Sequence, residues 1–196
     1  QTYSGTTTLS NGILLVHGRI ASAVMVEAAG TLGGTGVVRG LVTQDGVIAP
    51  GAGIGKLTIS NQVNVNATAV YRFELGGTNA PTDYDRLIAS DAHTPAGTLE
   101  VVTTNGYVPA SGDSFLIISN SALGGALFGT FGTETLPALA SGLGWVVTYT
   151  GNESVSLTVT GSLYSPTPYE LWAQSITNPA LRGEQEDADG DGSPNL

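Results

Sequence analysis

Three aspartates near the C-terminus have the spacing of a calcium-binding loop. In the sequence EDADGDGSPNL (186–196), Asp187, Asp189 and Asp191 occupy loop positions 1, 3 and 5, and a glycine occupies position 6. Ser193 offers a backbone carbonyl at position 7, and Asn195 falls at position 9. Carboxylate and carbonyl oxygens suit Ca²⁺, so these five residues are the predicted metal site and Ca²⁺ is the expected cofactor. A solvated acidic tail is the alternative interpretation.

The predicted loop stops before its last ligand. The glutamate that normally closes such a loop would be residue 198, whereas the sequence ends at Leu196. Calcium takes about six to eight oxygens, so we expect the site to be completed from outside the loop. The candidate donors are water, Glu184 or Glu186 folding back, and the N-terminal residues of a neighbouring subunit. A natural chain that continues past Leu196 is a further alternative.

The other residues that could do chemistry are sparse. His17 lies in LLVHGR and His93 in DAHTPAG, and neither has a nucleophile near it in the sequence. Asp83 and Asp85, in PTDYDRL, are two residues apart and would share one side of an extended segment, as an acid–base pair requires. The same segment is more typical of a turn that enters a strand, with Arg86 beside either acid. We therefore expect no catalytic residues and a protein that is not an enzyme.

Composition narrows the class of partner and the compartment. The chain carries 16 acidic and 6 basic residues, for a net charge of −10, which argues against nucleic acid as a partner. It has no cysteine, and no stretch reaches the roughly 20 apolar residues of a membrane span. The sequence starts at Gln1 without a signal segment, so we expect a mature form of a secreted, cell-surface or extracellular protein after signal cleavage.

The pattern of apolar residues predicts an all-β fold. Pairs such as Leu57 and Ile59, or Phe73 and Leu75, alternate with polar residues, which is typical of strands with one buried face. The 28 glycines separate these short segments, and similar units return after about 19–22 residues, a period that indicates a solenoid. An antiparallel β-sandwich would also show short alternating strands.

Two stretches resemble known families. The segments YSGTTTLSNGILLVHG, GTLGGTG and GVIAPGAGIGKLTIS, within residues 3–77, resemble the autotransporter-associated β-strand repeat of bacterial secreted proteins. Residues 78–160 continue this resemblance more loosely. That family implies a right-handed parallel β-helix. The tail is similar to the thrombospondin type 3 and dockerin-like calcium loops of bacterial extracellular proteins, which implies that it binds calcium.

We expect three parts: a parallel β-helix over residues 1–160, a Pro-containing linker with a capping helix over 161–183, and a calcium-binding tail over 184–196. The helix is predicted from YELWAQSI, where Tyr169, Trp172 and Ile176 recur at helical spacing.

The repeat begins almost at residue 1, which leaves an uncapped sheet edge that invites another strand. We therefore expect an extracellular structural protein, a calcium-stabilised solenoid that assembles head to tail with itself into a filament or surface layer. The alternative is a surface adhesin or glycan-binding rod segment of a larger secreted protein. A polysaccharide lyase or hydrolase is disfavoured, since the sequence lacks an evident cluster of catalytic residues.

Overall fold

The computed structural model describes residues 4–90, 93–120, 129–150, 154–163 and 172. The chain divides into two compact units, residues 1–162 and residues 163–196, and all of the described strands lie in the first unit. Most of the predicted linker and capping helix, and all of the predicted tail, lie outside the described residues. Trp172 is described, and its backbone is helical.

The first sheet has eight strands, and all of its pairings are parallel. Its strands are β1 (Thr7–Leu15), β3 (Val24–Gly34), β5 (Val42–Gln44), β6 (Val47–Pro50), β8 (Val63–Val65), β9 (Val70–Leu75), β11 (Thr98–Thr103) and β13 (Thr133–Thr135). The long strand β3 pairs with β1 on one side. On its other side, its first residues pair with β5 and its last residues pair with β6. The sheet therefore divides into two branches beyond β3.

The second sheet has seven strands and mixed directions, in the order β14-β15-β12-β10-β7-β4-β2. Its strands are β2 (Arg19–Ile20), β4 (Val37–Val38), β7 (Lys56–Ile59), β10 (Arg86–Ala89), β12 (Ser114–Asn120), β14 (Leu143–Thr150) and β15 (Ser154–Gly161). The strands from β2 to β12 are parallel, whereas β15 runs antiparallel to both β12 and β14.

The predicted right-handed parallel β-helix was therefore wrong, although the ordered elements of the described residues are nearly all strands. A solenoid repeats one parallel coil throughout, whereas here one sheet branches at β3 and the other ends in antiparallel strands. Only three residues separate β14 from β15. A parallel crossover needs about a dozen residues or more, so a connection of this length permits only an antiparallel hairpin.

Inward-facing residues of both sheets form one core. Leu57, Ile59, Phe73 and Leu75, which the alternation places on a buried face, are each 0% exposed. Phe115 packs edge-on against Tyr84 and Tyr107 and at a tilt against Trp145. The alternation in the sequence thus indicates correctly which side of each of these strands is buried.

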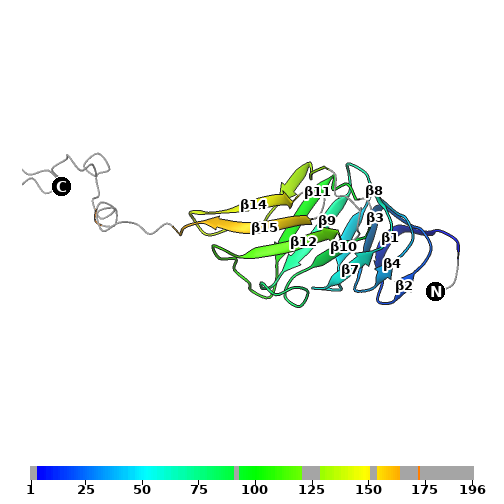
Figure 1. Cartoon of the computed structure of the whole chain (residues 1–196), viewed down its shortest axis with the longest axis horizontal. Coiled ribbons are helices and arrows are strands. Elements are labelled where there is room, and N and C mark those ends of the chain that lie inside the picture. The colour runs from blue at the N-terminus through cyan, green and yellow to red at the C-terminus, as the bar shows by residue number, and fades with distance from the viewer. Residues whose placement is uncertain (1–3, 91–92, 121–128, 151–153, 164–171, 173–196) are drawn as a thin grey trace, which may run out of the picture. The chain divides into compact units, whose positions relative to one another are not determined.

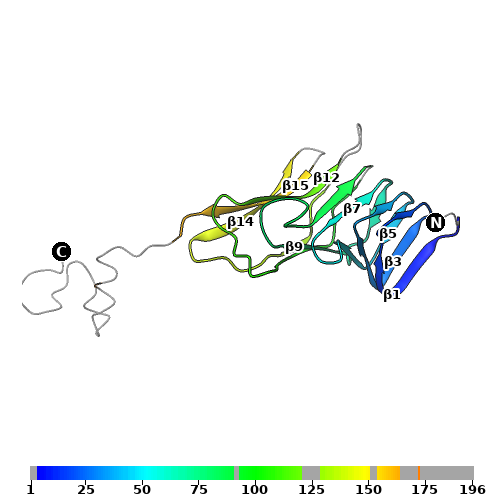
Figure 2. The same ribbon diagram turned by 90° about the horizontal axis from the view of Figure 1, so that it is seen from below.

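The strands follow one another along the first unit. Figure 1 shows β1 and β2 at one end and the β14–β15 hairpin at the other, and Figure 2 shows the same arrangement of β1, β14 and β15. Within the described part of the chain, no helix has both the length and the apolar character needed to cross a membrane.

Candidate functional site

The predicted metal ligands lie outside the described residues. This applies to the whole set: Asp187, Asp189, Asp191, Ser193 and Asn195. Among the residues that are described, no three His, Cys, Asp or Glu side chains are grouped so that they could hold a metal ion. The prediction of a calcium site in the tail therefore stays a prediction.

The two histidines have different surroundings. His17 is exposed, and its Nδ1 lies 3.4 Å from the Thr35 hydroxyl. His93 is 1% exposed, and its Nε2 lies 2.9 Å from the hydroxyl of Tyr71, whose ring it also contacts edge-on. Burial lowers the pKa of His93 to about 4. His93 is therefore a neutral residue of the core at ordinary pH.

The structure does not pair Asp83 with Asp85. Asp83 accepts a hydrogen bond from Asn79 Nδ2 at 2.8 Å, and its hydrogen bonds lower its pKa. Asp85 is buried and accepts from two backbone amides, that of Gly55 at 2.7 Å and that of Glu74 at 2.8 Å. Both oxygens of Asp85 are thus used to join the turn before β7 to β9, so the expected acid–base pair is not formed.

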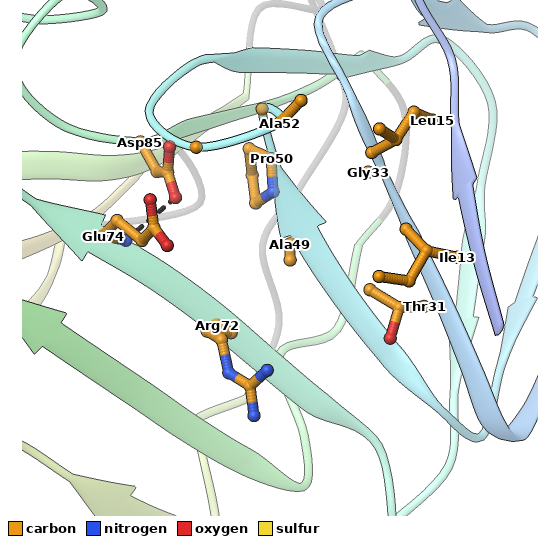
Figure 3. A pocket seen from close by; sticks show the side chains of 12 residues that line it. Ile13, Leu15, Thr31, Gly33, Ala49, Pro50, Ala52, Arg72, Glu74 and Asp85 are labelled. Carbon is orange, nitrogen blue, oxygen red and sulfur yellow. Dashed lines mark hydrogen bonds between the residues drawn. The ribbon is translucent and has the colours of Figure 1, made fainter.

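A hollow of about 360 Å³ lies on the outer side of the eight-stranded sheet (Figure 3). The surface is hollowed because β3, β6 and the following turn supply mainly small residues in its middle: Gly33, Ala49, Pro50, Gly51, Ala52 and Gly53. Gly51 and Gly53 have φ values of 88° and 97°, a region that favours glycine. Ile13 and Leu15 line one side of the hollow, and Arg72, Glu74 and Asp85 line the other.

The charged side of this hollow combines an ion pair with a perturbed carboxyl group. Arg72 Nη2 lies 2.9 Å from Glu100 Oε2. Burial raises the pKa of Asp85 to about 7, the charge of Glu74 adds to this, and the two amide hydrogen bonds oppose it. The hollow thus has an apolar side and a polar side that carries charges of both signs.

The edge of the eight-stranded sheet at β1 carries a second hollow. Among the described strands, β1 pairs with β3 alone, and its Ile13 and Leu15 are 69% and 43% exposed. The second hollow, of about 380 Å³, opens where the core ends between β1 and β2. Its lining is Thr7, Leu14, Leu15, Val16, His17, Gly18, Arg19 and Ile20. Leu15 therefore borders both hollows, and the exposed edge strand lies between them.

The sequence predicts an uncapped sheet edge near residue 1, but it indicates neither hollow. The first hollow joins residues of β1, β3, β6 and β9 with Asp85, which directly precedes β10, so its lining extends from Ile13 to Asp85 in the sequence. The run of small residues in IAPGAGIG was the local signal that could have suggested a depression. The charged residues opposite Ile13 could be placed only with the strand order known.

Comparison with known proteins gives one partial similarity. No family model matches the chain. The chain is similar to an extracellular serine protease of Serratia marcescens, with 32% identity over 102 residues. The match covers 52% of this chain and 10% of that protein, so this chain is compared with a small part of a much longer one.

The prediction that this protein is not an enzyme requires correction. The relative is named as a serine protease, which contradicts that prediction. The prediction came from the absence of clustered catalytic residues in the sequence, and such clusters are commonly assembled from residues that are distant along the chain.

Proposed function

We propose that this chain supplies a β-sheet segment of an extracellular protein and that the segment associates end to end with a second copy. The extracellular location is supported by the name of the Serratia relative and by the resemblance of residues 3–77 to a repeat of bacterial secreted proteins. The self-association is supported by one observation: β1 exposes apolar side chains and, among the described strands, pairs with β3 alone.

An edge strand presents backbone groups that can pair with another strand. Soluble proteins commonly protect such edges with charges, whereas β1 exposes Ile13 and Leu15 and carries no charged residue. At the other end, β13 and β14 are the outermost described strands of the two sheets. Because the two ends differ, a contact between them is heterologous and can repeat into a filament or layer.

The proposed self-association is tested by placing positive charges on the edge strand β1. The double variant Ile13→Lys/Leu15→Lys should sediment as a monomer at concentrations where the wild-type protein forms larger species. Val108→Lys is the matched control, since Val108 is 74% exposed and lies outside the strands. Equal self-association of the edge variant and the wild type, or a wild type that stays monomeric at high concentration, contradicts the proposal.

We propose calcium binding for the tail, on the strength of the ligand spacing alone. Titration calorimetry should detect calcium uptake by the wild type and a large loss of it in Asp189→Ala. Magnesium should compete poorly, because it requires a smaller octahedral shell. If both proteins take up calcium equally, the loop is not the site. Deleting residues 184–196 and repeating the sedimentation in calcium tests whether the metal joins neighbouring copies.

A second candidate function is glycan binding by an adhesin or a rod segment of a larger secreted protein. This function is favoured by the basic residues Arg19, Lys56 and Arg86, which lie on strands of the seven-stranded sheet.

A further inference from the structure

Charge is divided unequally between the two sheets. Among the described strands, those of the eight-stranded sheet carry four acidic residues and one basic residue: Glu27, Glu74, Glu100, Glu134 and Arg72. The described strands of the seven-stranded sheet carry three basic residues, Arg19, Lys56 and Arg86, and no acidic residue. In a chain of net charge −10, the seven-stranded sheet therefore has a basic outer face.

Four neighbouring strands each contribute one cation to this face. Arg19 begins β2, Arg39 directly follows β4, Lys56 begins β7 and Arg86 begins β10. These strands are consecutive in the sheet. Side chains alternate between the two faces of a strand, and the adjoining residues are buried in the core: Ile20, Val38, Leu57 and Leu87. The four cations consequently face outward, and we refer to them as the basic row.

The geometry of the basic row suits a linear ligand. Neighbouring strands lie about 4.8 Å apart, so the three intervals from β2 to β10 span roughly 14 Å across the sheet. The cations are staggered along the strands, because Arg19 is level with Val37 and Thr58, two residues beyond Lys56, and Arg39 lies two residues further on. Lys56 and Arg86 are direct partners in the parallel register, which brings two positive charges together. Arg86 Nη2 is 3.2 Å from the hydroxyl of Ser119 on β12, and this contact extends the polar surface to a fifth strand.

The described acids do not neutralise this row. Among the described residues, the ion pair present joins Arg72 to Glu100 on the other sheet. Asp85 precedes Arg86 in the chain, but its carboxyl is buried and accepts hydrogen bonds from the amides of Gly55 and Glu74. Two like charges held side by side, with no counter-charge among the described residues, favour the binding of an anion.

We propose that the basic row binds a linear anionic polysaccharide, one that carries carboxylate or sulfate groups along its length. A chain that runs obliquely across the strands meets Lys56 and Arg86 at one end and Arg19 and Arg39 at the other, with the hydroxyls of Thr58, Ser60 and Ser119 on the same face for hydrogen bonds to sugar hydroxyls. This inference rests on the second candidate function, glycan binding, and specifies its ligand class and its face. It does not depend on assembly through β1.

A second copy of this chain could also bind to the basic row, through the acidic outer face of its eight-stranded sheet. A polysaccharide fits better because Arg72 sits among those acids and is paired with Glu100, which lowers their net charge.

The experiment measures the binding of polygalacturonate and of dextran sulfate, with unmodified dextran as the neutral probe. EDTA is present throughout, so that the predicted calcium loop does not contribute. We expect binding of both anionic polymers, no binding of dextran, and a dissociation constant that rises roughly ten-fold or more between 50 and 200 mM salt. Lys56→Gln and the pair Arg19→Gln/Arg39→Gln should each weaken binding several-fold, and the triple change should abolish it.

Arg72→Gln is the matched control, because it removes a cation from the other sheet and should leave polysaccharide binding unchanged. Lys56, Arg19 and Arg39 are exposed, so these changes leave the core intact, and circular dichroism and the melting temperature verify folding. Unchanged binding in the triple variant, or no binding of either anionic polymer, overturns the inference. The inference is also overturned if RNA or anionic lipid vesicles bind more tightly than the anionic polysaccharides. It is overturned, too, if the triple variant loses self-association but keeps polysaccharide binding. Equal binding of dextran also overturns it, but leaves the broader glycan-binding function standing.

Discussion

The buried pair of His93 and Tyr71 should make the stability of the fold depend on pH. His93 is 1% exposed, its Nε2 contacts the Tyr71 hydroxyl, and its Nδ1 has no hydrogen-bond partner in the described part of the chain. Phe131 packs edge-on against Tyr71 and extends the apolar surroundings of the pair. A proton on His93 would place a positive charge in this core without a counter-charge, so the folded protein resists protonation.

The magnitude follows from the two pKa values. Burial lowers the pKa of His93 from 6.5 to about 4, so the unfolded chain binds a proton more readily between these values. Stability that is fully present above pH 6.5 is therefore lost as the pH falls towards 4. Proton linkage for this single group gives a loss of about 2 kcal/mol between pH 7 and pH 4.5.

The assay isolates this histidine by comparing two proteins. Urea unfolding of wild type and His93→Gln is measured at pH 7 and at pH 4.5, and the difference in unfolding free energy between the proteins is compared at the two pH values. That difference should shift by about 2 kcal/mol in favour of the variant on acidification. His17→Gln, which removes an exposed histidine, is the matched control. A difference that does not change with pH, or that changes equally in the control, would refute the reasoning.

Three further predictions follow from other contacts. Asp85 should act in the opposite direction to His93. Because burial raises its pKa from 3.8 to about 7, stability should fall as the pH rises through this range, and Asp85→Asn should remove that slope in urea unfolding. Gly36→Ala should lower the unfolding free energy by roughly 1–3 kcal/mol, since its Cβ would collide with the carbonyl oxygens of Gly18 and Val16, whereas Gly5→Ala, which meets open space, should not. Ile59→Asp should abolish folding, as judged by circular dichroism, because it buries an unpaired charge; a soluble variant as stable to heat as the wild type would show that the core tolerates the charge.

The sequence predicted the local features of the fold well. Alternation such as Leu57 and Ile59 identified the buried side of the strands, because the side-chain period of a strand is a property of the backbone itself. The order and direction of the strands could not be predicted from this alternation. The alternating residues of β14 and β15 are compatible with parallel or antiparallel pairing, and the short connection between them was visible only once the strand boundaries were known.

For the candidate sites, too, the sequence indicates local patterns but not the contacts made across a sheet. The spacing of Asp187, Asp189 and Asp191 is a local pattern, so the sequence alone carries the calcium prediction. By contrast, Asp83 and Asp85 looked like a pair because they are close in the chain, and the structure gives them separate partners. Proximity in the sequence is a poor guide to which carboxyl groups face each other across a sheet.

The sequence by itself determined that the described part of this chain consists mainly of β-strands, that the chain is acidic, and which strand residues face the core, since these follow from composition and from the two-residue period of a strand. The tertiary structure alone decided which strands are neighbours. Lys56 and Arg86 are thirty residues apart in the chain, yet they are register partners on adjacent strands. Parallel strands require long connections, so the residues that meet across them are always distant in the sequence, and only the folded sheet brings their charges together.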